Sequence, residues 1–90
     1  MKNKNYKNLY NDVRKISNSH DLMGLIRIGF PDDEYDPETS KVVPLLVGSV
    51  TLSELINGIV EIYNEMFDAD FKSSDKWIVD FATELFEMKK

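Results

Sequence analysis

The sequence predicts an all-α fold, built as a single compact domain of about four helices in an orthogonal or bundle-like arrangement. Apolar residues recur at spacings of three and four along several stretches, which is typical of helices with one buried face. The chain has 90 residues, enough for one domain with a modest core. Its composition, 42% hydrophobic and 30% charged with four Gly and three Pro, is that of a globular protein.

The first helix is expected from Lys4 to Asn18, where the apolar residues lie on one helical face: Tyr6, Leu9, Tyr10, Val13 and Ile16. The sequence "SNSHD" is expected to end it, because Ser and Asn offer the backbone competing hydrogen bonds. Asp21 is a candidate cap for the short turn that follows. Gly24 and Gly29 are free to take positive φ in that turn.

The second helix is expected from Pro37 to Gly48. Asp36 supplies an N-cap acceptor, Pro37 a preset φ, and Glu38 a charge favoured by the helix dipole. Pro44 lies inside this element and is expected to kink it. The run "VVPLLV" is also compatible with a buried strand, since a short apolar run does not reveal its period.

The third helix is expected over residues 52 to 67, behind a capping box formed by Thr51 and Glu54. The fourth follows the loop "DADFKSSD", with Ser73 or Ser74 as its cap. Its apolar stripe is Trp77, Ile78, Phe81, Leu85 and Met88. The aromatic residues expected in the core are Tyr63, Phe67, Trp77 and Phe81.

Charge is unevenly distributed along the chain. Residues 1 to 20 hold five basic residues and one acidic residue, a balance of +4. Because the whole chain carries −5, the remaining seventy residues carry −9. Such an acidic body lacks the cationic surface that nucleic-acid binding needs, so we expect no nucleic acid as a partner.

The sequence also argues against several other functional classes. There is no Cys, hence no disulfide, thiolate metal site or cysteine catalysis. The N-terminal stretch lacks the apolar region of a secretory signal, and no apolar run approaches the ~20 residues that span a bilayer. We therefore expect a soluble cytoplasmic protein without a membrane partner.

The segment from Asp32 to Glu38 contains five carboxylates. A calcium-binding loop would require Gly at its sixth position and Glu at its twelfth, where this chain has Pro37 and Val43. His20 is the single imidazole and is expected to be exposed near the end of the first helix. The sequence therefore predicts no catalytic residue, no metal ligand and no cofactor.

Acidic residues also follow the solvent faces of the third and fourth helices. Like charges four residues apart, such as Glu61 with Glu65, each cost a helix about 0.2 to 0.5 kcal/mol, and a merely solvated face would normally mix signs. The leading interpretation is a small acidic, non-enzymatic protein-binding module that engages a basic protein. The predicted partner-binding residues are Asp32, Asp33, Glu34, Tyr35, Glu61 and Glu65.

Three alternatives remain open at this point. The acidic surface could serve only solubility. The chain could act as a structural or housekeeping homodimer through apolar residues such as Phe30 and Phe71. It could also be a metal-dependent nucleotide hydrolase, because Glu65-x-x-Asp68 and Glu84-x-x-Glu87 resemble the carboxylate pairs of all-α nucleotide pyrophosphohydrolases, although in reversed order.

The stretch from Asp21 to Glu38, "DLMGLIRIGFPDDEYDPE", resembles the signature D-P-x-G-L-x-x-x-G-A-P-x-D-E-Y-D-x-E of a family of short bacterial helical proteins of unknown function. Leu22 and Phe30 depart from it, standing where the family has Pro and Ala. The resemblance implies a compact α-helical fold and no established activity. Similar acidic motifs occur in small immunity proteins of bacterial toxin systems, an analogy that adds an immunity or inhibitor role to the leading interpretation.

Overall fold

The computed structural model describes residues 6–31 and 33–89, with side chains for residues 8–31 and 33–88. Its four helices are α1 (Tyr6–His20), α2 (Asp36–Gly48), α3 (Leu52–Phe67) and α4 (Lys76–Lys89). No strand occurs in the described ranges, so the all-α prediction is confirmed and the strand alternative for residues 42–47 is wrong.

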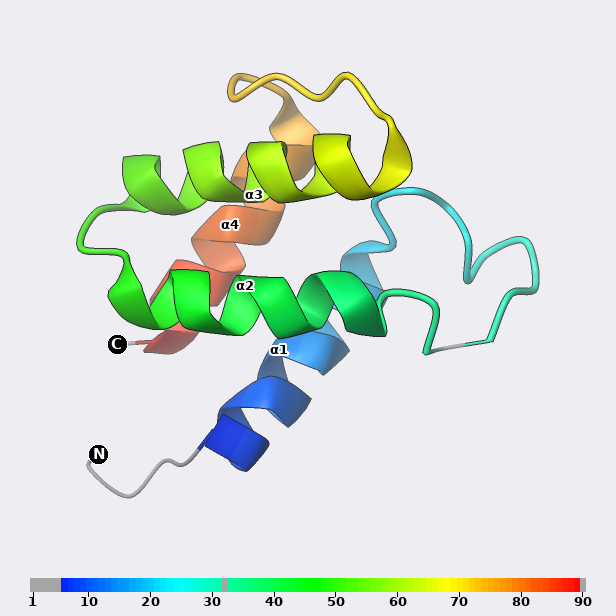
Figure 1. Ribbon diagram of the computed structural model, residues 1–90, viewed down its shortest axis with the longest axis horizontal. Coiled ribbons are helices and arrows are strands. Elements are labelled where there is room, and N and C mark those ends of the chain that lie inside the picture. Colours follow the sequence, from blue (N-terminus) through cyan, green and yellow to red (C-terminus); the bar gives the residue numbers. More distant parts are fainter. Residues whose placement is uncertain (1–5, 32, 90) are drawn as a thin grey trace.

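Helices α2 and α3 lie side by side and run in opposite directions, joined by the short connection from Ser49 to Thr51 (Figure 1). Helix α4 passes behind both, and α1 crosses below α2 and contacts α4. The longer segment between α1 and α2, residues 21–35, projects from one end of this arrangement. This projecting segment carries most of the acidic motif.

All four helices contribute to one core, and Tyr63 lies at its centre. The Tyr63 ring contacts four other aromatic rings with centroid distances of 5.6 to 6.4 Å, those of Tyr35, Phe67, Phe71 and Phe81. Its hydroxyl lies 3.2 Å from the Ser17 hydroxyl on α1. The buried apolar residues are Val13, Tyr35, Val42, Val43, Leu46, Leu55, Ile59, Tyr63, Ile78, Phe81, Ala82 and Leu85.

Helix α3 forms where the sequence predicts it. The Thr51 hydroxyl accepts from the Glu54 N–H at 3.1 Å, and the Glu54 carboxylate accepts from the Thr51 N–H at 3.2 Å. This capping box satisfies two N–H groups that would otherwise lack partners, and it depends only on residues close in sequence. The helix ends at Phe67, after which Asp68 takes a left-handed conformation with φ of 53°.

Helix α2 corrects the prediction at its first turn. It begins at Asp36, one residue before Pro37, and its N-cap residue Tyr35 makes no side-chain capping bond. The helix then continues through Pro44 to Gly48 as one ribbon (Figure 1). Pro44 is exposed, whereas the helix buries an apolar face elsewhere, so packing outweighs the missing hydrogen bond.

The ends of α1 and α4 also differ from expectation. The residues "SNSH" are helical, and α1 ends only where Asp21 takes a φ of 48°. Helix α4 begins at Lys76, so neither Ser73 nor Ser74 stands at its start. Instead the Asp75 carboxylate accepts from the Lys72 N–H at 2.9 Å and closes the preceding turn.

Trp77 lies outside the core, contrary to prediction. Its side chain is 70% exposed, whereas Ile78, Phe81 and Leu85 are fully buried. With 100° between successive helical residues, Trp77 stands roughly a quarter-turn from the centre of the buried face of α4. Met66 on α3 is likewise 37% exposed.

None of the helices in the described ranges combines the length and the apolar character that a membrane crossing requires.

The two aromatic residues of α4 allow a direct test of this placement. Phe81→Ala should lower the free energy of unfolding by about 3 to 5 kcal/mol, because it empties a fully buried site. Trp77→Ala should change it by no more than about 0.5 kcal/mol in dilute protein. Chemical denaturation followed by circular dichroism measures both free energies of unfolding. Equal losses for the two variants would indicate that Trp77 is buried in the core.

Candidate functional site

The Asp21 carboxylate is the centre of the segment that joins α1 to α2. It accepts from the Tyr35 hydroxyl at 2.6 Å, from the Ile26 N–H at 3.1 Å and from the Arg27 N–H at 3.0 Å. Arg27 Nη2 lies 4.0 Å from its Oδ2 atom. Asp21 was expected to act as a cap for a short turn, and its carboxylate does bind backbone N–H groups, five and six residues further on.

The Tyr35 hydroxyl completes this arrangement by accepting from the Met23 N–H at 2.9 Å and more weakly from the Leu25 N–H at 3.4 Å. Its ring packs against Tyr63 and Phe67. The Tyr35 ring therefore lies in the core, and its hydroxyl meets a carboxylate. Tyr35 was also predicted to bind a partner. Because its side chain is 0% exposed, that prediction is corrected.

Hydrogen bonding determines the charge states of this pair. Burial by itself would raise the pKa of Asp21, but the bonds from Tyr35 and from the Ile26 and Arg27 N–H groups, with the Arg27 charge, hold that pKa below its usual value of 3.8. Burial and the neighbouring Asp21 carboxylate raise the pKa of Tyr35 to about 12. At neutral pH the pair is thus a carboxylate and a neutral hydroxyl donor.

The backbone between these two residues is compact and specific. Gly24 and Gly29 take φ values of 72° and 105°, as the sequence led us to expect. The Gly24 N–H donates to the Asp21 carbonyl at 2.8 Å, and the Phe30 N–H donates to the Leu25 carbonyl at 3.0 Å. The glycines, the aspartate and the tyrosine of the motif therefore act together as one folded loop.

Asp36 pairs with α1 instead of capping its own helix. Its Oδ1 atom accepts from Arg14 Nε at 2.8 Å, with both side chains about one-third exposed. An N-cap role needs only local backbone groups, but this carboxylate is used for a contact 22 residues away. The bridge ties the start of α2 to α1.

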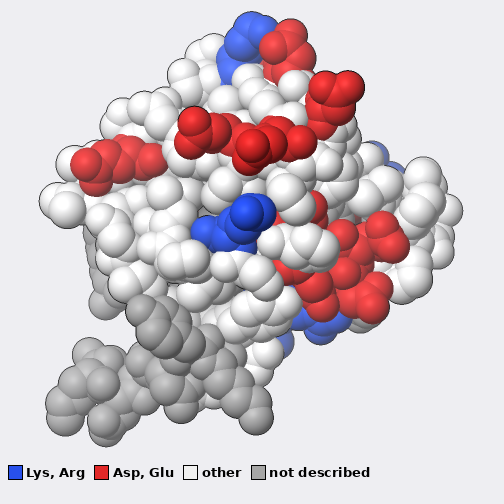
Figure 2. Space-filling view, in the orientation of Figure 1, with Lys and Arg blue, Asp and Glu red and all other residues white. Residues whose placement is uncertain are grey.

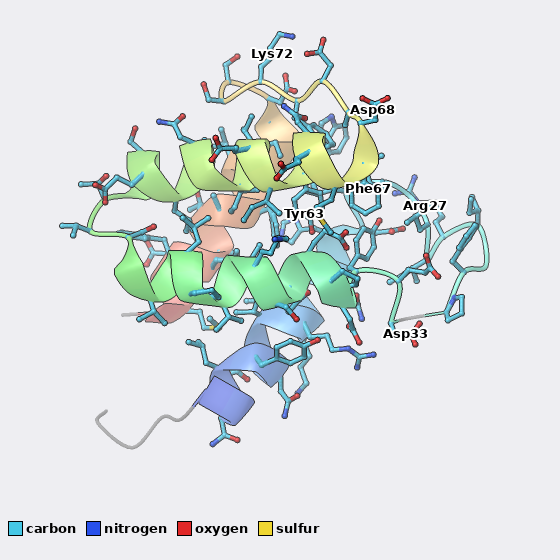
Figure 3. The ribbon with its side chains drawn as sticks, in the orientation of Figure 1. Arg27, Asp33, Tyr63, Phe67, Asp68 and Lys72 are labelled. Atoms are coloured by element: carbon cyan, nitrogen blue, oxygen red, sulfur yellow. The ribbon has the colours of Figure 1, made fainter. Side chains whose placement is uncertain are left out.

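The remaining acidic residues of the motif divide into exposed and buried groups. Asp33 is exposed and Glu34 half-buried, on the limb of the loop that returns to α2 (Figure 3). Asp32 lies outside the described residues. In the described part of the chain, neither Asp33 nor Glu34 forms a side-chain hydrogen bond or ion pair.

Glu38 was predicted as a charge favoured by the helix dipole at the start of the second helix. It is only 4% exposed, and its Oε1 atom has no hydrogen-bond partner among the described residues. Burial raises its pKa above the usual 4.5; its own backbone N–H acts in the opposite sense, and Glu34 and Asp36 raise the pKa further. The folded state is consequently more stable when Glu38 is protonated than when it is ionised.

The acidic face of α3 consists of Glu61, Glu65 and Asp68, all exposed. Within the described ranges their carboxylates form no ion pair and no hydrogen bond. Figure 2 shows acidic atoms in a row over α3 and a second acidic group near the loop before α2, with a group of basic atoms between them. The two predicted residues on α3 therefore lie together on an open surface.

Helix α4 uses more of its acidic residues internally. Glu84 Oε1 lies 2.8 Å from His20 Nε2, and the His20 ring stacks near Phe81 at 5.4 Å. The His20 side chain is 20% exposed, so the prediction of an exposed imidazole is corrected. Lys76 Nζ donates to Asp80 at 2.8 Å.

The two carboxylate pairs that suggested a nucleotide hydrolase lie apart. Glu65 and Asp68 are at the end of α3, whereas Glu84 and Glu87 are at the end of α4, which runs away from that point (Figure 1). Within the described residues no three His, Asp or Glu side chains are placed to hold a metal ion together. This geometry gives the pairs no shared site.

No protein-family model matches the chain, and the searches of curated proteins and of solved structures find no match either. The resemblance of residues 21–38 to the bacterial helical family stays a prediction. Any inference about function therefore rests on the site itself.

Sequence reasoning missed three features of this surface: the Arg14–Asp36 bridge, the His20–Glu84 pair and the burial of Glu38. A signal existed for the Asp21–Tyr35 bond, because both residues belong to the motif and Asp21 was expected to accept hydrogen bonds as a cap. No local signal existed for the other three, since each depends on how distant helices pack.

Removing the Tyr35 hydroxyl tests the loop. Tyr35→Phe takes a donor from Asp21 and an acceptor from the Met23 N–H, so the free energy of unfolding should fall by about 1 to 3 kcal/mol. Tyr10→Phe is the matched control, because the Tyr10 hydroxyl has no hydrogen bond among the described residues. Denaturant titration at neutral pH measures both; indistinguishable midpoints would contradict the role assigned to Tyr35.

Glu38 makes stability depend on pH with a defined sign. Because its folded-state pKa is raised, its contribution is fully present below pH 4.5 and is lost as pH rises through the folded-state value. Glu38→Gln should therefore gain melting temperature relative to the unmodified protein as pH increases from acid to neutral. The effect of Asp21 has the opposite sign but is common to both proteins and cancels in the difference.

The control for this comparison is Glu65→Gln, which changes the same chemical group on the exposed face of α3. Its melting temperature relative to the unmodified protein should change much less with pH than that of Glu38→Gln, because only the repulsion from Glu61, about 0.2 to 0.5 kcal/mol, is relieved. A constant offset between Glu38→Gln and the unmodified protein across the pH range would show that Glu38 is not the titrating group.

Proposed function

We propose that this chain is a small, non-enzymatic binding module that engages a basic protein, in the manner of an immunity or inhibitor protein. The observation that carries the proposal is the α3 face of Glu61, Glu65 and Asp68, whose carboxylates are exposed and without a counter-charge among the described residues. Within those residues the fold makes no use of them. Their mutual repulsion opposes helix formation by about 0.2 to 0.5 kcal/mol per i,i+4 pair.

A cationic partner would turn this repulsion into attraction. Rim charges at protein interfaces contribute mainly to the association rate and to the choice of partner, and their effect decreases as salt screens them. The charge of the body, −9 beyond residue 20, adds a long-range field that favours the approach of a positive surface. The loop acids Asp33 and Glu34 add to this field from a second position.

We propose the bacterial cytoplasm as the setting, which agrees with the absence of cysteine and with the resemblance of residues 21–38. The described geometry does not favour the nucleotide-hydrolase alternative, since the carboxylate pairs of α3 and α4 stand apart. The homodimer alternative concerns a different surface from the α3 face.

The proposal is tested by capture from a bacterial lysate, followed by kinetic measurement with the captured protein. Glu61→Gln combined with Glu65→Gln should slow association at low salt by about tenfold, because two charges that steer the partner are removed. The dissociation rate should change less. The same slowing should appear for the unmodified protein when salt is raised.

A control with the same change in net charge is Asp80→Asn combined with Glu84→Gln, on α4, where both acids already have partners. This variant should associate nearly as fast as the unmodified protein. A partner whose binding is insensitive both to salt and to the α3 substitutions would contradict the proposal.

A further inference from the structure

Two large apolar side chains stand exposed at the tip of the loop between α1 and α2. Ile28 is 70% exposed and Phe30 is 46% exposed. The loop that carries them is held by the Asp21 carboxylate, the Tyr35 hydroxyl and the bond from the Phe30 N–H to Leu25. An ordered protrusion with apolar residues at its end is a typical anchor for a partner surface.

A pocket of about 320 Å³ opens beside the base of the same loop. Its walls include Leu22 and Met23 from the loop, and Phe71 and Trp77 from the far side. Trp77, which the core does not use, forms part of this wall with 70% of its side chain exposed. The volume is at the lower end of the range of ligand pockets, and its walls combine these apolar side chains with the polar side chains of His20, Asp21 and Arg27.

Opposite charges flank this surface. Arg27, which lines the pocket, has a side chain that is 74% exposed and meets Asp21 only at 4.0 Å. Asp33 is exposed on the other limb of the loop, and Figure 3 shows the two residues on opposite limbs. One patch therefore contains an apolar protrusion, a pocket with both apolar and polar walls, a cation and an anion.

We propose that this patch binds a second copy of the chain through a twofold axis. In an isologous dimer each copy offers the same patch, so a protrusion and a pocket on one surface are both filled at once. Phe30 and Ile28 of each copy enter the pocket beside Trp77 of the other. Arg27 of each copy faces Asp33 and Glu34 of the other.

Charge complementarity is the reason for a second copy rather than another protein. A foreign partner would need its own matching cation, anion, protrusion and pocket, whereas this chain carries all four within one loop and its base. The proposed contact uses none of the α3 residues Glu61, Glu65 and Asp68. The inference therefore does not depend on the proposed binding of a basic protein.

Size-exclusion chromatography with light scattering, from about 1 µM to about 1 mM protein, tests the dimer. The mass of the unmodified protein should rise toward twice that of the monomer. Phe30→Ser and Trp77→Ser should each weaken the dimer at least tenfold, and Val50→Ser, at a side chain 79% exposed outside this loop, should not. Circular dichroism of each variant verifies that it is folded.

Charge reversal in two separate chains gives a stricter test. Arg27→Glu and Asp33→Arg should each weaken self-association when alone, since each sets like charges against one another twice. Mixed together they should form a heterodimer, visible by native mass spectrometry, because every pair across the axis is then of opposite sign.

Three results would overturn the inference. They are a monomer at every concentration, a dimer that Phe30→Ser and Trp77→Ser leave intact, and an equimolar mixture of the charge variants with no preference for the heterodimer. The second result would assign the dimer to another surface.

Discussion

The bond from the Tyr35 hydroxyl to the Asp21 carboxylate, 2.6 Å long, is the contact on which the functional surface depends. It connects the aromatic core, through the Tyr35 ring, to a loop whose residues Leu22, Met23, Leu25 and Ile26 also pack against the core. The same carboxylate holds two backbone N–H groups, and the same hydroxyl holds a third at 2.9 Å. Without this pair the N–H groups of Met23, Ile26 and Arg27 would lose their acceptors, and the loop would lose the hydrogen bonds that fix its shape.

The rest of the molecule can be understood as support for that contact. Tyr63 packs against the Tyr35 ring and joins α3 to α1 and α4 through its neighbours. Arg14 holds the start of α2 through Asp36, directly after Tyr35 in the chain. Acidic side chains that serve neither purpose remain on the surface, and the proposed function rests on those on α3.

The sequence was sufficient where structure is decided locally. Helix α3 was predicted to the residue, because its capping box and apolar period lie within the helix and its first flanking residues. The positive φ of Gly24 and Gly29 followed from residue type alone. Asp36 shows the limit, since a good local cap was available but a guanidinium from α1 was in reach only once the helices had packed.

The same limit explains the errors at Trp77 and Glu38. A period identifies a helical face, but it does not say how far that face extends at the first turn, where Trp77 stands. Glu38 was predicted only as a helix-starting charge, and its burial by the packing of α2 was not foreseen. For the candidate surface, the acids of the loop and of α3 could be identified from sequence, but their division into paired and unpaired residues required the fold.

Amide hydrogen exchange of the loop, followed by NMR, addresses the role of the Asp21–Tyr35 pair most directly. The N–H groups of Met23, Ile26 and Arg27, which donate to this pair, should exchange far more slowly than that of Asp33, which has no hydrogen bond among the described residues. Exchange of all four at similar, unprotected rates would mean that the pair does not hold the loop, and would contradict the dependence of the functional surface on this bond.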